Sequence, residues 1–230
     1  MGLDVLVLGG ANTDFLVKGR ELPRHDTTVA GDTFRQASGG KGLNQAVAAA
    51  RLGARTGFFG RLRRDARGDE ALRTLEAERL EVIHVSRDGE RPTGVALVMV
   101  DERGRKQIMT APGANLGVTA ADVTQAAELI ANARVLLLQL ELPLEVVETA
   151  VRLANAAGVP VVLDPAPPRE LSEGLLQGVD LIRPDSDEAH VLTGLRVIDR
   201  ESARRAGRNL LARGVRAAVV GAPGGDLLIT

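Results

Sequence analysis

SGGKGLNQAVAAARLGA, residues 38–54, joins a glycine-rich turn to an Ala-rich apolar segment. The run Leu43–Leu52 stops at Gly53, and this pattern predicts a helix that ends at a glycine. The N-terminus of such a helix offers unpaired N–H groups, the preceding glycines let a ligand approach the backbone, and Lys41 adds a positive charge. The turn therefore fits a polar or anionic ligand, although the same residues could also form an ordinary tight turn.

The segments around this turn predict an α/β fold with one main core. Val5–Leu8 is a continuous apolar run before a pair of glycines, as expected for a strand buried on both faces. From about residue 120, helical and strand patterns alternate, which predicts a parallel sheet with right-handed crossovers. The predicted helices are 120–133, 144–157, 186–193 and 201–213, and the predicted strands are 135–139, 161–163, 181–182 and 217–220.

The first half of the chain is more mixed. Residues 15–38 have no helical period and are interrupted by Gly and Pro, so we expect extended segments and turns that could form a flap. A helix is predicted over 65–79, and residues 93–100 and 105–110 predict a hairpin around a four-residue turn. At the other end of the chain, Leu227–Ile229 has the pattern of a strand that waits for a partner.

Composition and charge exclude several classes of function. The chain has 230 residues, with 29 Lys and Arg against 30 Asp and Glu, so we expect neither nucleic acid nor a membrane as partner. Because Cys is absent, a disulfide framework, a Cys-ligated zinc site and a thiol nucleophile are excluded. No Ser or Thr follows Lys41, which excludes a Walker A loop. Without a signal peptide pattern or a membrane-length apolar run, the sequence favours a cytoplasmic protein.

Acidic residues follow several of the predicted strands. Asp14, Glu141, Asp164 and Asp185 each come shortly after an apolar strand pattern. In open α/β sheets, ligands bind outside the carboxyl ends of the strands. We therefore expect these four side chains to converge on one crevice.

The stretch 38–54 resembles the first signature of the ribokinase family of carbohydrate kinases, with Leu43 where Ala is usual. The resemblance continues in order along essentially the whole chain. It implies a ribokinase-like α/β fold, in which helices flank a central, mostly parallel sheet (an αβα sandwich) and a small β lid has its strands roughly within 15–38 and 93–110. The other similar stretches are GGANTD (9–14), PTGVALVMVDERGRKQI (92–108), APGAN (111–115), LLLQLELP (136–143), LDPAPPREL (163–171) and RPDSDEA (183–189).

One part of the resemblance concerns a sugar. Asn12 and Asp14 match the family's Asn-x-Asp after the first strand, where an amide and a carboxylate can hold vicinal hydroxyls. The residues themselves leave open a solvated turn at this position and a plain surface charge at Lys41. The full set of substrate-binding residues that the resemblance implies is Asn12, Asp14, Gly40, Lys41, Asn44 and Glu141.

A second part concerns ATP and Mg²⁺. Asp185 and Glu188 match the family's Asn-x-x-Glu motif, with Asp in place of Asn, and imply a nucleotide contact at Asp185 and a metal contact at Glu188. The same residues are also a plain helix start with Asp185 as N-cap. Gly221, Gly224 and Gly225 lie where the family has its nucleotide turn, but Pro223 removes a backbone donor there. The resemblance leaves open whether a monovalent cation such as K⁺ is needed.

The family's second signature, Asp-Thr-x-Gly-Ala-Gly-Asp, supplies the catalytic Asp and the anion hole, and no match to it is found before Thr230. The resemblance thus implies a catalytic base beyond Thr230 and none within the chain. Ala30–Phe34 copies the end of that signature, but we expect Asp32 to lie in a lid strand. A clipped or incompletely recorded kinase and an inactive sugar-binding remnant are the open alternatives.

The activity implied is ATP-dependent phosphorylation of a pentose, most simply D-ribose to ribose 5-phosphate. Such a transfer needs positioning and charge stabilisation, with a carboxylate to accept the hydroxyl proton. The implied partners are a small sugar and ATP, together with a second copy of the chain that pairs through the lid.

Overall fold

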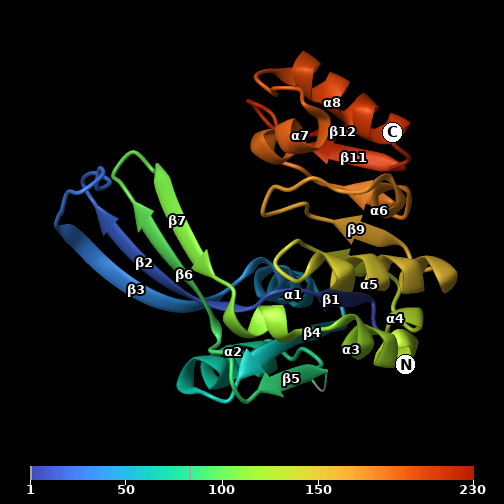
Figure 1. Ribbon diagram of the computed structural model, residues 1–230, viewed down its shortest axis with the longest axis horizontal. Coiled ribbons are helices and arrows are strands. Elements are labelled where there is room, and N and C mark those ends of the chain that lie inside the picture. Colours follow the sequence, from blue (N-terminus) through green and yellow to red (C-terminus); the bar gives the residue numbers. More distant parts are fainter. Residues whose placement is uncertain (1, 83) are drawn as a thin grey trace.

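The computed structural model describes residues 2–82 and 84–230, which form a large sheet with its helices and a smaller sheet beside it (Figure 1). The strand order of the large sheet is β12-β11-β10-β9-β8-β1-β4-β5. Neighbouring strands are parallel, except that β12 is antiparallel to β11. The strands are β1 (Val5–Leu8), β4 (Thr56–Arg63), β5 (Val85–Asp88), β8 (Leu136–Leu138), β9 (Val161–Leu163), β10 (Leu181–Ile182), β11 (Ala217–Val220) and β12 (Leu227–Ile229).

The helices pack on both faces of β1, because alternate side chains of a strand point to opposite faces. Val7 belongs to a core cluster with residues of α1 (Lys41–Arg51) and α2 (Ala66–Ala77). Leu6 and Leu8 belong to a larger cluster that the remaining helices complete. Those helices are α3 (Ala120–Gln125), α4 (Ala127–Ala131), α5 (Leu144–Ala156), α6 (Glu173–Gln177), α7 (Ser186–Thr193) and α8 (Arg200–Ala212).

The smaller sheet projects to one side of the large sheet (Figure 1). Its strand order is β3-β2-β6-β7, from β2 (Asn12–Gly19), β3 (Gly31–Gly39), β6 (Gly94–Val100) and β7 (Lys106–Ala111). The chain passes directly from β1 through residues 9–11 into β2. A short 3-10 helix, η1 (Gly113–Gly117), follows β7 and leads the chain back to the large sheet.

The predicted α/β class with a mostly parallel sheet is confirmed, whereas several local predictions differ from the structure. Residues 12–14 are the start of β2, so the solvated turn that the residues left open at this position is not formed. The helix predicted over 120–133 is broken into α3 and α4 at Ala126, where Thr124 Oγ1 donates back to the Ala120 carbonyl, a bond that bends helices. Leu227–Ile229 has a partner, since it pairs with β11 along one edge.

Besides the 3-10 helix η1, three of the described elements lie where the sequence predicts no strand or helix. The strand β4 contains Gly57 and Gly60, which weaken a strand pattern, yet its first five residues are buried. The other two, β5 and α6, are short. None of the helices in the described residues combines the length and the apolar character that crossing a bilayer requires.

Candidate functional site

The carboxyl ends of β1, β8, β9 and β10 meet at one edge of the large sheet, and the four acidic residues predicted to converge lie there. The Lys41 backbone N–H donates to Glu141 Oε2 at 2.7 Å, and Lys41 Nζ lies 3.8 Å from Asp164 Oδ2. The negative charge of Asp14 raises the pKa of Glu141, and the negative charge of Asp185 raises the pKa of Asp164. The start of α1 is therefore at the centre of this edge.

The glycines at positions 39, 40 and 42 lie in close contact with the Asp14 side chain and with the backbone after β1. Gly40 has φ of 92°, in the left-handed region that favours glycine. A Cβ on Gly42 would lie 2.7 Å from the carbonyl carbon of Gly9, so the first turn of α1 packs directly on the backbone after β1. A Cβ on Gly39 would lie 2.1 Å from Asp14 Oδ2. The turn thus brings α1 and the Asp14 carboxylate close to the same backbone.

The N-terminus of α1 differs from what the sequence suggested, because the N–H groups of Lys41 and Leu43 already have partners. The Lys41 N–H donates to Glu141 Oε2 at 2.7 Å. The Leu43 N–H donates to the Gly10 carbonyl at 3.1 Å. The Glu141 side chain therefore caps the first N–H of α1 from another part of the chain, and an anionic ligand would have to compete with it for the Lys41 N–H.

Asn12 is buried and its Oδ1 accepts a hydrogen bond from Asn115 Nδ2 at 2.9 Å. Asn115 Oδ1 in turn accepts from the Ala11 N–H at 3.1 Å. Asn115 ends the stretch 111–115 that resembles the family, but the sequence pattern does not mark it as a site residue. Its role depends on a contact across more than 100 residues, which no local pattern reports.

Burial raises the pKa of the Asp14 carboxyl. Burial also raises the pKa of Glu141, and the negative charge of Asp14 adds to this effect, while the Lys41 N–H and ammonium oppose it. Of the other predicted sugar contacts, Gly40 lies buried in the turn and Asn44 is exposed on α1. Several titratable groups with shifted pKa values at one sheet edge are typical of a functional site.

Asp185 and Glu188 form the start of α7. Asp185 Oδ1 accepts from the N–H groups of Asp187 and Glu188, and Glu188 Oε2 accepts from the Asp185 N–H at 2.8 Å. Burial raises the pKa of Glu188, and the charges of Asp185 and Asp164 raise it further. The predicted cap is therefore present, and each carboxylate keeps a second oxygen that is not part of it.

This pair fits Mg²⁺ only as it occurs in kinases, where one or two carboxylates and the nucleotide phosphates hold the ion together. Among residues 2–82 and 84–230, no group of three or more His, Asp or Glu side chains is arranged to hold a metal by itself. The predicted nucleotide turn lies nearby, since the Gly221 N–H donates to the Pro184 carbonyl. Gly224 and Gly225 both have positive φ, and the adjacent Asp226 pairs with Arg183 at 3.1 Å.

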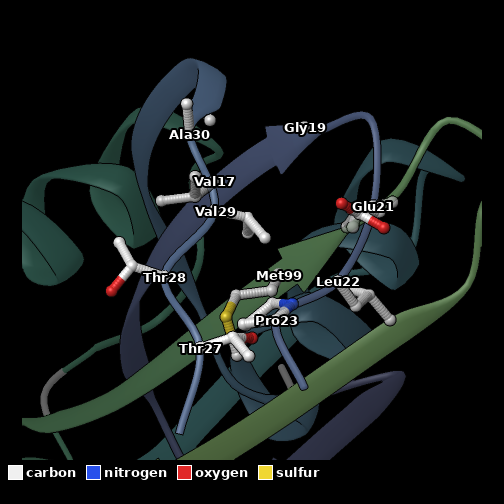
Figure 2. Close-up of a pocket in the computed structure, with 12 residues that line it drawn as sticks. Val17, Gly19, Glu21, Leu22, Pro23, Thr27, Thr28, Val29, Ala30 and Met99 are labelled. Atoms are coloured by element: carbon white, nitrogen blue, oxygen red, sulfur yellow. The ribbon is translucent and has the colours of Figure 1, made fainter. Parts of the chain in front are cut away.

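A hollow of about 260 Å³ lies elsewhere, at the outer end of the smaller sheet (Figure 2). Leu22, Pro23, Val29 and Met99 line it. It is at the opposite end of β2 from Asn12, so it is separate from the acidic edge of the large sheet.

Comparison with known proteins shows which family has this architecture. The model of the pfkB family of carbohydrate kinases matches residues 3–225. The chain belongs to this family. It is 37% identical over 214 residues to the ribokinase of Haemophilus influenzae, covering 93% of this chain and 70% of that protein. It is 35% identical over 231 residues to the ribokinase of Schizosaccharomyces pombe, covering 95% of this chain and 71% of that protein.

A solved structure of Arabidopsis thaliana ribokinase, complexed with ribose and ATP, superimposes on the whole chain with a TM-score of 0.88, 30% identity and 75% of that protein covered. The ribokinase-like fold and the membership in a family of sugar kinases are thereby confirmed. The alternative of an inactive sugar-binding remnant has no support in these comparisons.

Proposed function

We propose that this carbohydrate kinase transfers the terminal phosphoryl group of ATP to the primary hydroxyl of D-ribose. The observation that carries this proposal is the cluster of Asn12, Asp14, Lys41 and Glu141 at one sheet edge, together with the likeness to a ribokinase described in complex with ribose and ATP. Vicinal hydroxyls need acceptors and donors at short spacing, and a carboxylate, an amide and an ammonium provide both.

Each residue of the cluster has a definite part in this proposal. Asp14 accepts from two neighbouring hydroxyls, and Asn12 offers its amide nitrogen, because its oxygen is already bonded to Asn115. Glu141 binds a hydroxyl through Oε1, because Oε2 caps α1. Gly40, Lys41 and Asn44 complete the sugar contacts on the turn and on α1. The base that takes the hydroxyl proton is assigned to none of these residues.

For the nucleotide, we propose that its phosphates lie between the start of α1 and the start of α7. Asp185 and Glu188 would hold Mg²⁺ through their second oxygens or through water, and the turn containing Gly221, Gly224 and Gly225 would border the nucleotide. The bound ion would neutralise phosphate charge during transfer. It would also relieve the burial of negative charge at Glu188.

We further propose that the smaller sheet is a lid that also pairs with a second copy. One face carries Asp14 toward the site, and residues on the opposite face include Phe15, Phe34, Leu97 and Met109, by the pairing register. Phe34 and Met109 are 62% and 72% exposed, and the Phe15 and Phe34 rings stack at 6.2 Å. An exposed apolar face of this kind favours association.

Isothermal titration calorimetry with D-ribose, 2-deoxyribose and D-xylose tests the sugar assignment directly. The wild-type protein should bind ribose best, and Asp14→Asn, which keeps the shape and removes the charge, should weaken binding by roughly 10-fold or more. Asp26→Asn, in the exposed loop after β2, serves as the matched control. Equal binding of all three sugars, or an unchanged affinity in the Asp14 variant, would argue against the proposal.

A further inference from the structure

A chain of polar side chains runs beneath the candidate sugar site. Gln139 Nε2 donates to Gln45 Oε1 at 2.6 Å, and Gln45 Nε2 donates to Asp164 Oδ2 at 3.2 Å. The same oxygen of Asp164 lies 3.8 Å from Lys41 Nζ. Four residues, from α1 and from the segments that follow β8 and β9, therefore form a chain of contacts that ends at the Lys41 ammonium group.

The fold places these residues together for simple geometric reasons. Lys41 and Gln45 are four residues apart in α1, so their side chains leave the same face of the helix. Gln139 and Asp164 directly follow β8 and β9, which are parallel with Leu138 opposite Leu163. The Asp164 N–H continues this ladder by donating to the Leu138 carbonyl at 2.9 Å. The two strand ends thus lie side by side below α1.

The orientation of each amide in the chain follows from the carboxylate. An ionised Asp164 can only accept, so Gln45 must present its NH₂ to it and its oxygen to Gln139. Gln139 must then present its own NH₂ to Gln45, and its oxygen is left facing Gly9. Gln139 is completely buried, and among the described residues this oxygen has no hydrogen-bond partner. An unpaired buried acceptor costs about 1–3 kcal/mol, so this orientation of the amides is not one that the stability of the fold alone favours.

The ion pair at the end of the chain is itself a weak source of stability. The Lys41 side chain is 40% exposed, and exposed pairs of this kind contribute about 0–1 kcal/mol. The pair instead restricts the direction in which the Lys41 side chain points, because this side chain could otherwise move freely on its flexible stem. We propose that Asp164 is a positioning residue that holds the Lys41 ammonium at the sugar site, with its own carboxylate oriented by Gln45 and Gln139.

The position of Lys41 explains why its ammonium group would need to be held in place, and this explanation rests on the proposed function. The positive charge of Lys41 opposes the rise in the pKa of three carboxyls, those of Glu141, Asp164 and Glu188. These carboxyls border the proposed sugar and nucleotide sides of the site. A fixed ammonium between the two sides can contact a sugar oxygen without first losing side-chain freedom. Gln45 and Gln139 therefore act through Lys41 and not through a contact with the sugar.

Lysine NMR gives a direct test, since the chain has only three lysines, Lys18, Lys41 and Lys106. Reductive methylation with ¹³C-formaldehyde labels each of them and keeps the charge, and Lys41→Arg assigns the signal of Lys41. In the wild type this signal should be displaced from those of the exposed Lys18 and Lys106. In Asp164→Asn it should move to within a linewidth of them, and in Gln45→Met it should move in the same direction.

Asp187→Asn is the control, because it removes the same charge from the same sheet edge at an exposed position of α7. The proposal is overturned if the wild-type Lys41 signal coincides with the other two, if Asp164→Asn leaves it in place, or if the control moves it equally. A fixed signal in Gln45→Met alone overturns the part assigned to the glutamines. This readout needs no sugar, so it stays informative even if ribose is not the substrate.

Ribose titration then tests the link to binding. Asp164→Asn should weaken ribose binding about threefold or more in the wild-type background and have no further effect in a Lys41→Met background, because the two residues act as one unit. Independent effects of the two substitutions would contradict the positioning role. If the wild type binds no ribose, the proposed function fails, and the NMR result still decides whether Asp164 positions Lys41.

Discussion

Adding one methyl group at Gly39 should impair sugar binding with little other damage. A Cβ there would lie 2.1 Å from Asp14 Oδ2 and 2.3 Å from Asp14 Cγ, against a normal separation of about 3.5 Å, so the carboxylate has to move by more than about 1 Å. Hydrogen bonds to a charged group contribute about 1.5–3 kcal/mol. Losing one through Gly39→Ala should therefore weaken ribose binding by roughly 10- to 150-fold.

The assay is calorimetric titration of ribose into Gly39→Ala, with urea unfolding as a check on stability. Gly174→Ala is the matched control, because a Cβ at Gly174 meets nothing within 4 Å. In an Asp14→Ala background, Gly39→Ala should cause no further loss, because the group that it displaces is absent. Affinity within twofold of the wild type, or an equal loss in both backgrounds, would refute the reasoning.

Three further predictions concern stability and assembly. Asn115→Ala leaves the Ala11 N–H and Asn12 Oδ1 without their partner, so urea unfolding should show a loss of about 2–5 kcal/mol, against little change in the exposed control Asn132→Ala. Glu141→Gln should gain stability relative to the wild type as pH rises from 4 to 7.5. The raised pKa of Glu141 gives the wild type a stabilisation that is present at low pH and lost as pH rises through that pKa, and a constant difference in urea unfolding would contradict this. Phe34→Glu should halve the mass in sedimentation velocity if the lid faces pair, whereas Thr33→Glu, on the opposite face of β3, should not.

The parts of the fold that the sequence predicted are those with strong local patterns. The alternation after residue 120 predicted the parallel strands, and the acidic residues after strands predicted one crowded edge. The strand β4 was missed because Gly57 and Gly60 interrupt its pattern, although the large sheet buries it. Local preference fails there because tertiary packing stabilises the strand.

The candidate site shows the same limit. The left-handed conformation of Gly40 agrees with the glycine-rich turn that the local sequence predicts, whereas the occupation of the Lys41 N–H by Glu141 depends on a residue 100 positions away. The role of Asn115 and the chain from Gln139 to Lys41 are also set by contacts between distant segments. Sequence reasoning predicted residue types that are suited to binding a sugar, but it could not show which of their atoms already have hydrogen-bond partners.

Because β1 continues directly into β2, a movement of the smaller sheet would also move residues of the candidate site. Asn12 and Asp14 lie at the fixed end of a projecting arm, where β2 leaves the large sheet. A rotation of that arm relative to the large sheet would carry the Asp14 carboxylate with it, while Glu141, which follows β8, would stay with the large sheet. The distance between Asp14 and Glu141 would therefore change with the angle of the arm.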